Sequence, residues 1–294
     1  MDRFSTGAKF EYLLFDMDDT LYPLSSGLNL ACRKNIQDYM LNNLQIEESQ
    51  VPKMCLALYK EYGTTMAGLK ALGFEFDNDE FHAYVHGKLP YETLKPDPVL
   101  KHLLLSMPQC KIIFTNADKA HAEKVLSRLG LEDCFEGVIC FETLNPPLEA
   151  DGNCKKMDDA APLNDDQLIN KNVHGYFSET DSDTDAANNV SMTDSNWQRI
   201  LCKPSLEAME AAIRIANIDP KKTIFFDDSA RNIAVGKAAG FHTVIVGSSV
   251  LVPGADVALE SIHNMKEALP EIWEGGEKLG SLLSSTAVET IVHA

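Results

Sequence analysis

Short apolar runs that end in polar residues recur along this chain, and the first of them constrains the fold most. Residues 13–15 read Leu-Leu-Phe and are followed by Asp16, Asp18 and Thr20. Three consecutive apolar residues indicate a strand buried on both faces, as in a parallel sheet covered by helices. Because such sheets bind ligands at the carboxyl ends of their strands, Asp16 and Asp18 are predicted to lie at that edge.

The carboxylate pair after this strand indicates a particular chemistry. Two carboxylates at a partly buried edge repel each other unless a cation neutralises them, and hard oxygen ligands favour Mg²⁺. One carboxylate can attack phosphorus while its neighbour transfers protons. Asp16 and Asp18 therefore suggest a magnesium-assisted reaction at a phosphoryl group.

Strands and helices alternate over most of the remaining chain. Asp97 and Pro98 form a helix-start signal, and Gly130 is placed to end a later helix. Further strands are expected at residues 112–114, 138–141, 223–226 and 243–246, and helices at residues 98–105, 119–129, 205–216 and 233–239. Such alternation forms right-handed β-α-β units. The expected fold is α/β, a doubly wound and mostly parallel sheet formed by residues 10–24 and 92–250.

A helical segment interrupts this alternation after the first strand. Between residues 25 and 91, apolar side chains recur at spacings of three and four, which predicts three helices without a strand between them. We interpret residues 25–91 as an α-helical cap inserted into the sheet domain. Residues 251–273 are interpreted as a C-terminal extension of the core, and residues 274–294 as a tail.

Residues 146–199 form a second interruption, of a different kind. They contain eleven aspartates and glutamates against four lysines and arginines, with few aliphatic residues. Such a segment cannot bury enough apolar surface to offset its ordering entropy, so it is predicted to be a disordered insertion within the core. Residues 178–185 are a candidate target for an acid-directed kinase. A merely solvated acidic loop is the open alternative.

The overall composition limits the partners. The formal net charge of −18 repels nucleic acid and anionic membranes, so neither is expected as a partner. A small phosphorylated metabolite is compatible, because its binding depends on local amides, a lysine and a metal. Seven cysteines without C-x-x-C spacing, and the lack of an apolar signal core, predict a cytoplasmic protein with nuclear entry left open. The oligomeric state is not defined by the sequence.

Three further segments place ligand-binding groups at strand ends or at a helix start. Thr115 and Asn116 follow the second expected strand and offer a hydroxyl and backbone amides to phosphate oxygens. Lys203 stands just before an expected helix, and Asp227 and Asp228 follow the fourth expected strand. Taken singly, Asp228 could be a helix cap or turn residue, and Lys203 a solvated surface lysine.

Together and in this order, the four segments resemble the motifs of the haloacid dehalogenase (HAD) superfamily. The matching residues are Asp16-Met17-Asp18-Asp19-Thr20, Thr115-Asn116, Lys203-Pro204 and Asp227-Asp228. The resemblance covers residues 10–145 and 200–250, and the helical insert stands at the family's first cap position. Within the superfamily, residues 15–22, 62–69 and 89–91 are similar to the pyrimidine 5′-nucleotidase-like branch.

The resemblance implies a Mg²⁺-dependent phosphatase, with UMP or CMP as the first substrates to consider. Asp16 would attack phosphorus and become an aspartyl phosphate, while Asp18 would protonate the leaving group and later deprotonate water. Thr115 and the amide of Asn116 would hold phosphoryl oxygens, whose charge Lys203 would stabilise.

The same resemblance implies the metal ligands. They would be Asp16, the backbone carbonyl of Asp18, and Asp227. Asp228 would be either a further ligand or a residue that orients one.

The connection formed by Tyr62, Gly63, Thr64 and Thr65 is the candidate for substrate recognition within the cap. A glycine and two hydroxyls between helices could contact a leaving group when the cap closes and excludes water. An ordinary helix connection is the open alternative.

Three other functions are considered. A dehalogenase is disfavoured, because the family's dehalogenases do not need the second aspartate, Asp18. A phosphomutase would share every motif. A non-catalytic regulator would act through the acidic insertion, and the intact motifs argue against it.

Four histidines and one cysteine are assigned no chemistry. The histidines stand without the spacing of metal ligands. Cys202 is interpreted as a small packing residue. The histidines are His86, His102, His121 and His242.

Overall fold

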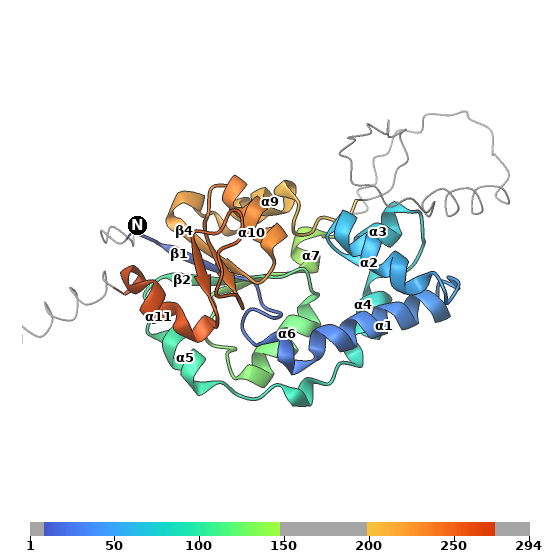
Figure 1. Ribbon diagram of the computed structural model, residues 1–294, viewed down its shortest axis with the longest axis horizontal. Helices are drawn as coiled ribbons and strands as arrows, with labels where there is room; N and C mark the ends of the chain where they lie inside the picture. Colours follow the sequence, from blue (N-terminus) through green and yellow to red (C-terminus); the bar gives the residue numbers. More distant parts are fainter. Residues whose placement is uncertain (1–8, 148–198, 274–294) are drawn as a thin grey trace, which may run out of the picture.

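A six-stranded parallel sheet forms the centre of the computed structural model, which describes residues 9–147 and 199–273 (Figure 1). The strand order is β3-β2-β1-β4-β5-β6, and every strand pairs in parallel with its neighbours. The strands are β1 (Tyr12–Phe15), β2 (Cys110–Phe114), β3 (Gly137–Ile139), β4 (Thr223–Asp227), β5 (His242–Val246) and β6 (Val257–Leu259). The predicted α/β fold with a doubly wound sheet is confirmed.

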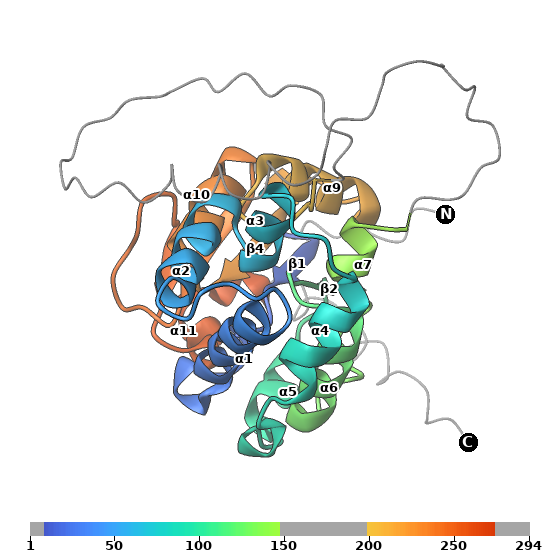
Figure 2. The ribbon, with the colours of Figure 1, turned by 90° about the vertical axis from the view of Figure 1, so that its right-hand side faces the viewer.

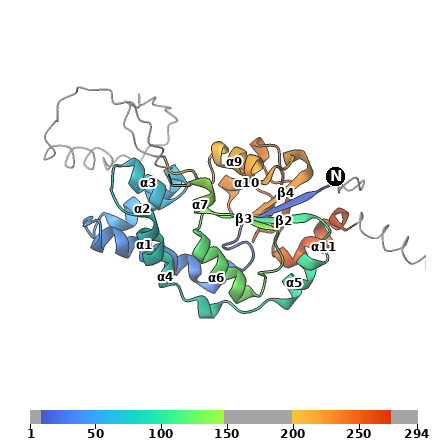
Figure 3. The ribbon, with the colours of Figure 1, turned by 180° about the vertical axis from the view of Figure 1, so that it is seen from behind.

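Helices cover both faces of the sheet because its strands are apolar on both faces. Leu13 and Phe15 of β1 belong to the apolar cluster on one face, and Leu14 belongs to the cluster on the other. Figure 3 shows the two helical layers on opposite sides of the sheet. One layer contains α5 (Pro98–Leu105), α6 (Lys119–Leu129) and α11 (Met265–Ala268), and the other α9 (Leu206–Ala216) and α10 (Ala230–Ala238).

Local signals set the ends of these helices. The Asp97 side chain accepts a hydrogen bond from the Leu100 amide, 2.9 Å away, and Pro98 is the first residue of α5. Gly130 ends α6 with a φ of 69°, in the left-handed region that favours glycine. Short elements complete the path: α7 (Phe141–Leu144) and 3₁₀ helices at Leu24–Ser26, Tyr91–Thr93, Pro220–Lys222, Ile262–Asn264 and Pro270–Ile272.

Four helices lie between β1 and β2, at the side of the sheet where β1 ends (Figures 1 and 2). They are α1 (Leu28–Asn42), α2 (Val51–Tyr62), α3 (Thr65–Ala71) and α4 (Asn78–Gly87), and we call residues 28–87 the four-helix segment. Three helices were expected, but Gly63, with a φ of 88°, ends α2, and Thr64 caps a further helix, α3. The segment has its own core, in which the Tyr39 ring contacts Phe81 edge to face.

Close contacts join the four-helix segment to the sheet domain. A Cβ atom on Gly63 would lie 2.4 Å from the Lys203 carbonyl oxygen, so only glycine permits this approach. On the other side, the Arg231 guanidinium donates hydrogen bonds of 3.1 and 2.8 Å to the carbonyls of Tyr59 and Lys60 at the end of α2. These contacts fix the segment above the carboxyl ends of the strands.

Asn145 joins two parts of the chain that are far apart in the sequence. Its side chain donates to the Leu201 carbonyl at 3.0 Å and accepts from the Leu201 amide at 2.7 Å. The predictions of a disordered insertion at residues 146–199, a kinase target at residues 178–185 and a tail at residues 274–294 fall almost wholly outside the described residues.

The C-terminal part of the described chain adds to the sheet. Strand β6 was not predicted, and it pairs with β5 inside the extension at residues 251–273. The strand expected at residues 138–141 ends at Ile139, because Phe141 begins α7 instead. None of the described helices is both long enough and apolar enough to span a membrane.

Packing against the sheet predicts the cost of truncating α5. Leu100 is fully buried, whereas Leu105, on the same helix, is 55% exposed. Leu100→Ala should lower the free energy of unfolding by about 2–5 kcal/mol, because it leaves a cavity in the core. Leu105→Ala is the matched control and should change it by less than about 0.5 kcal/mol. Urea denaturation measures both, and equal effects would contradict this packing.

Candidate active site

A buried lysine joins the ends of three strands. The Lys203 ammonium donates hydrogen bonds to Asp16 Oδ1 at 2.7 Å, Asp227 Oδ2 at 2.8 Å and the Phe114 carbonyl at 2.7 Å. Its side chain is 1% exposed. Strands β1 and β4 are neighbours at the point where the strand order reverses, which is where open α/β sheets bind ligands. The structure thus brings together Asp16, Lys203 and Asp227, three of the candidate site residues.

The carboxylates here outnumber the cation. Oxygen atoms of Asp16, Asp227 and Asp228 lie within 4.8 Å of one another, and Lys203 offsets one negative charge. Burial raises the pKa of Asp16, and repulsion from Asp227 adds to this effect while Lys203 opposes it. Asp228 is exposed on one side, yet desolvation and the charges of Asp16 and Asp227 raise its pKa. A cluster of hard oxygen ligands with uncompensated negative charge fits Mg²⁺.

Two residues outside the four sequence motifs orient Asp227. The Asn232 side chain donates to both carboxylate oxygens, at 2.9 and 3.0 Å, and the Ser229 amide donates to Oδ1 at 2.9 Å. Both follow β4, where α10 begins. They restrict the rotation of Asp227 and leave Asp228 as the more accessible carboxylate.

The segment after β2 lies beside Lys203. The Asn116 side chain donates to the Lys203 carbonyl at 3.0 Å and accepts from the Lys203 amide at 2.8 Å. Thr115 Oγ1 accepts a hydrogen bond from the Ala117 amide at 3.1 Å, which leaves its proton free to donate. The sequence pointed to the main-chain amide of Asn116; its side chain additionally positions the lysine.

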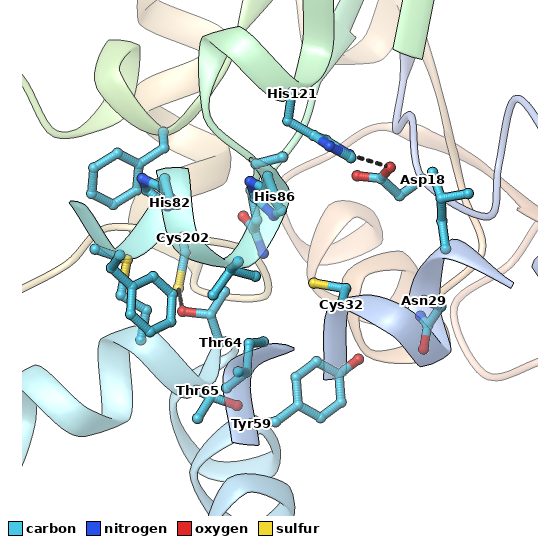
Figure 4. A pocket seen from close by; sticks show the side chains of 18 of the residues that line it. Asp18, Asn29, Cys32, Tyr59, Thr64, Thr65, His82, His86, His121 and Cys202 are labelled. Carbon is cyan, nitrogen blue, oxygen red and sulfur yellow. Dashed lines mark hydrogen bonds and ion pairs between the residues drawn. The ribbon is translucent and has the colours of Figure 1, made fainter. Parts of the chain in front are cut away.

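Asp18 lies beside this cluster and is held by two donors. The Tyr22 hydroxyl donates to Asp18 Oδ1, and His121 Nε2 lies 2.8 Å from the same oxygen (Figure 4). Burial raises the pKa of Asp18, but His121 and Tyr22 outweigh it, so the pKa is lowered. Burial lowers the pKa of His121, but Asp18 outweighs it, so that pKa is raised.

His86 and His121, to which the sequence assigned no chemistry, thus lie beside a predicted site residue. The ring of His121 stacks on His86 at 4.4 Å between centroids, and His86 is hydrogen-bonded to Asp118. His86 lies on α4 and His121 on α6, so spacing along the chain could not relate these two rings. The i,i+4 spacing of His82 and His86 was a signal for a histidine pair on α4 alone. His102 is exposed on α5, and His242, the first residue of β5, pairs with Asp256.

A pocket of about 260 Å³ opens between Asp18 and the four-helix segment. Gly63, Thr64 and Thr65 line it, whereas Tyr62 is not among its lining residues. The Thr64 hydroxyl accepts from the Ala67 amide at 3.1 Å, and the Thr65 hydroxyl donates to the Cys55 carbonyl at 3.2 Å. Both hydroxyls therefore already serve the local helix structure.

Two buried polar atoms at this pocket have no hydrogen-bond partner in the described residues. They are Asp19 Oδ1 and His82 Nδ1, and both residues line the pocket. Asp19 has a φ of 60°, which is uncommon for a residue other than glycine and often marks a functional site. Cys202, interpreted as packing, is buried and donates its thiol to the Tyr62 carbonyl; it also lines the pocket.

The chain is similar in sequence to a curated yeast protein over part of its length. No family model matches the chain. Over 149 residues, it is 28% identical to "Phosphate metabolism protein 8" of Saccharomyces cerevisiae, an alignment that covers 48% of this chain and 46% of the yeast protein. The chain thus matches about half the length of this curated relative.

Solved structures are similar over most of the chain. CbbY from Rhodobacter sphaeroides in complex with phosphate has a TM-score of 0.50 at 13% identity, covering 90% of this chain and 99% of CbbY. The chain shares its fold with CbbY. The putative HAD-hydrolase YfnB from Bacillus subtilis, bound to magnesium, has a TM-score of 0.48 at 17% identity, covering 88% and 98%.

The carboxylate cluster predicts stabilisation by Mg²⁺. A ligand that binds only the folded state at 100 times its Kd adds about 2.7 kcal/mol to the free energy of unfolding. Thermal denaturation should show this gain for the wild type and its loss for Asp227→Asn. Asp256→Asn, which alters a carboxylate outside the cluster, is the control and should keep the gain. A similar Mg²⁺ effect in all three proteins would contradict a metal site at the cluster.

Proposed function

We propose that this chain is a Mg²⁺-dependent phosphomonoesterase of the HAD superfamily that acts on a small phosphate ester. The observation that carries the proposal is the bridge of Lys203 between Asp16 and Asp227, with Asp18 beside it. A cation among three carboxylates at strand ends suits a phosphoryl group, whose charge must be neutralised and whose position must be fixed. The order of these residues in the chain, which matches the superfamily's motifs, supports the same reading.

The proposed reaction has two steps. In the first, an Asp16 oxygen forms a bond to phosphorus while the ester bond breaks, and Asp18 gives the departing alkoxide a proton, which the negative charge of the bound ester favours on this carboxyl group. In the second, the Asp18 carboxylate takes a proton from water, whose oxygen attacks the aspartyl phosphate. Phosphate leaves, Asp16 is regenerated, and Asp18 is protonated again. Ester and water become alcohol and phosphate.

The side chains around phosphorus have separate tasks in this proposal. Lys203 and the Thr115 hydroxyl bind phosphoryl oxygens, and the Asn116 side chain keeps Lys203 in place. Asp16, the Asp18 carbonyl and Asp227 would hold the metal, with Asp228 as a further ligand. Bound Mg²⁺ would supply positive charge that draws the phosphoryl group and the carboxylates together.

The pocket next to Asp18 supports an uncharged leaving group. Its lining includes Asp18, whose charge is paired with His121, and Asp19, whose carboxylate has no cationic partner in the described residues, together with apolar side chains. Burial lowers the pKa of His82 to about 4 and also lowers that of His86, so both rings favour the neutral form at neutral pH. Such a pocket repels a second phosphate. We therefore propose a monophosphate with a neutral alcohol part, and a pyrimidine nucleoside monophosphate such as UMP or CMP as the first substrate to assay.

The same pocket weighs against the alternatives. A phosphomutase that turns over a doubly phosphorylated intermediate would need positive charge where the second phosphate lies. A dehalogenase would not need Asp18, which here has two dedicated donors. A regulator without catalysis would not require the charge cluster at Asp16.

Replacing the nucleophile tests the proposed reaction. Wild-type protein with Mg²⁺ should release phosphate from at least one ester in a panel of nucleotides and sugar phosphates. Asp16→Asn should lower this activity by about a thousand-fold or more, as loss of a nucleophile does in other enzymes. Asp133→Asn alters a surface carboxylate paired with Lys101 and is the control. A wild type that is inactive on every ester, or an undiminished mutant, would refute the reaction.

The charge of the pocket gives a separate test of the substrate class. A nucleoside 5′-monophosphate should have a kcat/KM at least about tenfold above that of the same nucleoside's 3′,5′-bisphosphate, because juxtaposed like charges are strongly unfavourable. Asp19→Asn removes one negative charge from the pocket and should reduce the ratio of the two kcat/KM values. Equal kcat/KM values for both substrates in the wild type would contradict a neutral leaving group.

A further inference from the structure

Two donors converge on one oxygen of the Asp18 carboxylate. The Tyr22 hydroxyl and His121 Nε2 both hydrogen-bond to Oδ1. Within the described residues, Oδ2 accepts no hydrogen bond. Asp18 lines the pocket, and Figure 4 shows the His121 ring pointing toward the Asp18 carboxylate. The two oxygens of this carboxylate are therefore in different environments.

The ring of His121 is held from several directions. Its Nδ1 lies 2.7 Å from the Tyr91 hydroxyl, and its side chain is 3% exposed. One face stacks on His86, which is itself hydrogen-bonded to Asp118. The Asp118 carboxylate also accepts the His121 amide, 3.3 Å away, at the start of α6. The ring cannot turn away from Asp18 without breaking several of these contacts.

This arrangement matters for proton transfer. A carboxyl group gives a proton efficiently only when the oxygen that carries it faces the leaving group at hydrogen-bonding distance. With Oδ1 occupied by two donors, the proton of a neutral Asp18 resides on Oδ2. A carboxyl group without these donors can rotate about its side-chain bonds, and a displacement of about 1 Å can cost a hundred-fold in rate.

We propose that His121 and Tyr22 are positioning residues that hold Asp18 with Oδ2 facing the leaving-group oxygen. The inference rests on the proposed phosphatase function and adds two residues to it. Neither residue contacts the phosphoryl group in this proposal. Both act through Asp18, at the step in which the ester oxygen departs with a proton.

Two esters separate this role from a structural one. 4-Nitrophenolate leaves without needing a proton, whereas the alkoxide of a nucleoside monophosphate needs one. The kcat/KM value reports the steps up to departure of the leaving group. Within these steps, only the nucleoside monophosphate needs Asp18 as an acid. Each variant is assayed with both esters in the presence of Mg²⁺.

The variants are chosen to remove donors with little change of shape. Tyr22→Phe deletes only the hydroxyl, and His121→Phe keeps a ring for stacking on His86. His121→Gln keeps an N–H group that can reach Asp18. The matched controls are Tyr84→Phe and His102→Phe, which alter residues outside the pocket lining.

Positioning predicts a selective loss. His121→Phe should lower kcat/KM for the nucleoside monophosphate by roughly 10- to 100-fold and leave that for 4-nitrophenyl phosphate nearly unchanged. Tyr22→Phe should show the same selectivity, and His121→Gln should recover part of the lost activity. Both controls should behave as the wild type with either ester.

Two results would overturn the inference while the proposed function stands. In one, the wild type is active and the variants lose kcat/KM equally for both esters, which marks a structural role. In the other, Tyr22→Phe and His121→Phe keep the wild-type kcat/KM for both esters. Tyr22→Phe decides the matter if His121→Phe fails to fold. A wild type inactive with every ester would instead refute the proposed function, and this inference with it.

Discussion

The bridge formed by Lys203 is the interaction on which the rest of the site depends. Its ammonium group links the ends of β1, β2 and β4 in a region closed to solvent. A buried charge is tolerated only when it is paired, and removal of one partner of such a pair costs about 3–5 kcal/mol. The Asn116 side chain holds the main chain of Lys203 through two hydrogen bonds, and Gly63 allows α2 and α3 to pack against the Lys203 carbonyl. Lys203 thus serves both the charge cluster, through its ammonium group, and the contact with the four-helix segment, through its carbonyl.

The sheet and its charged edge could be predicted because the physics there is local. A strand buried on both faces must be an apolar run, and a parallel sheet places all its carboxyl ends at one edge. Asp16 and Asp227 could thus be brought together without coordinates, and the resemblance to the HAD motifs added Lys203. Strand β6 could not be predicted, since Val257–Leu259 is too short to stand out from the surrounding loop.

The surroundings of Asp18 depend on tertiary packing and were missed. His121 follows β2 in the sequence, while His86 belongs to α4 and Tyr91 to the turn after it. No periodicity relates them, because their proximity results from how α4 and α6 meet. Thr64 also has a local role that the sequence did not reveal: its hydroxyl caps α3, and the residue lines the pocket as well. Sequence patterns locate reactive groups better than they locate the residues that orient them.

The paired hydrogen bonds between Asn145 and Leu201 have a consequence for how this fold can vary. They bring Asn145 and Leu201 together, so the described chain on either side of residues 148–198 meets at one point of the core. The entropy of closing a loop grows only slowly with its length, by about 0.6 kcal/mol per doubling. Evolution or protein design can therefore vary the segment that joins Asn145 to Leu201. Lys203, two residues after Leu201, keeps its position because Asn145 and Asn116 hold the main chain on either side of the strand ends.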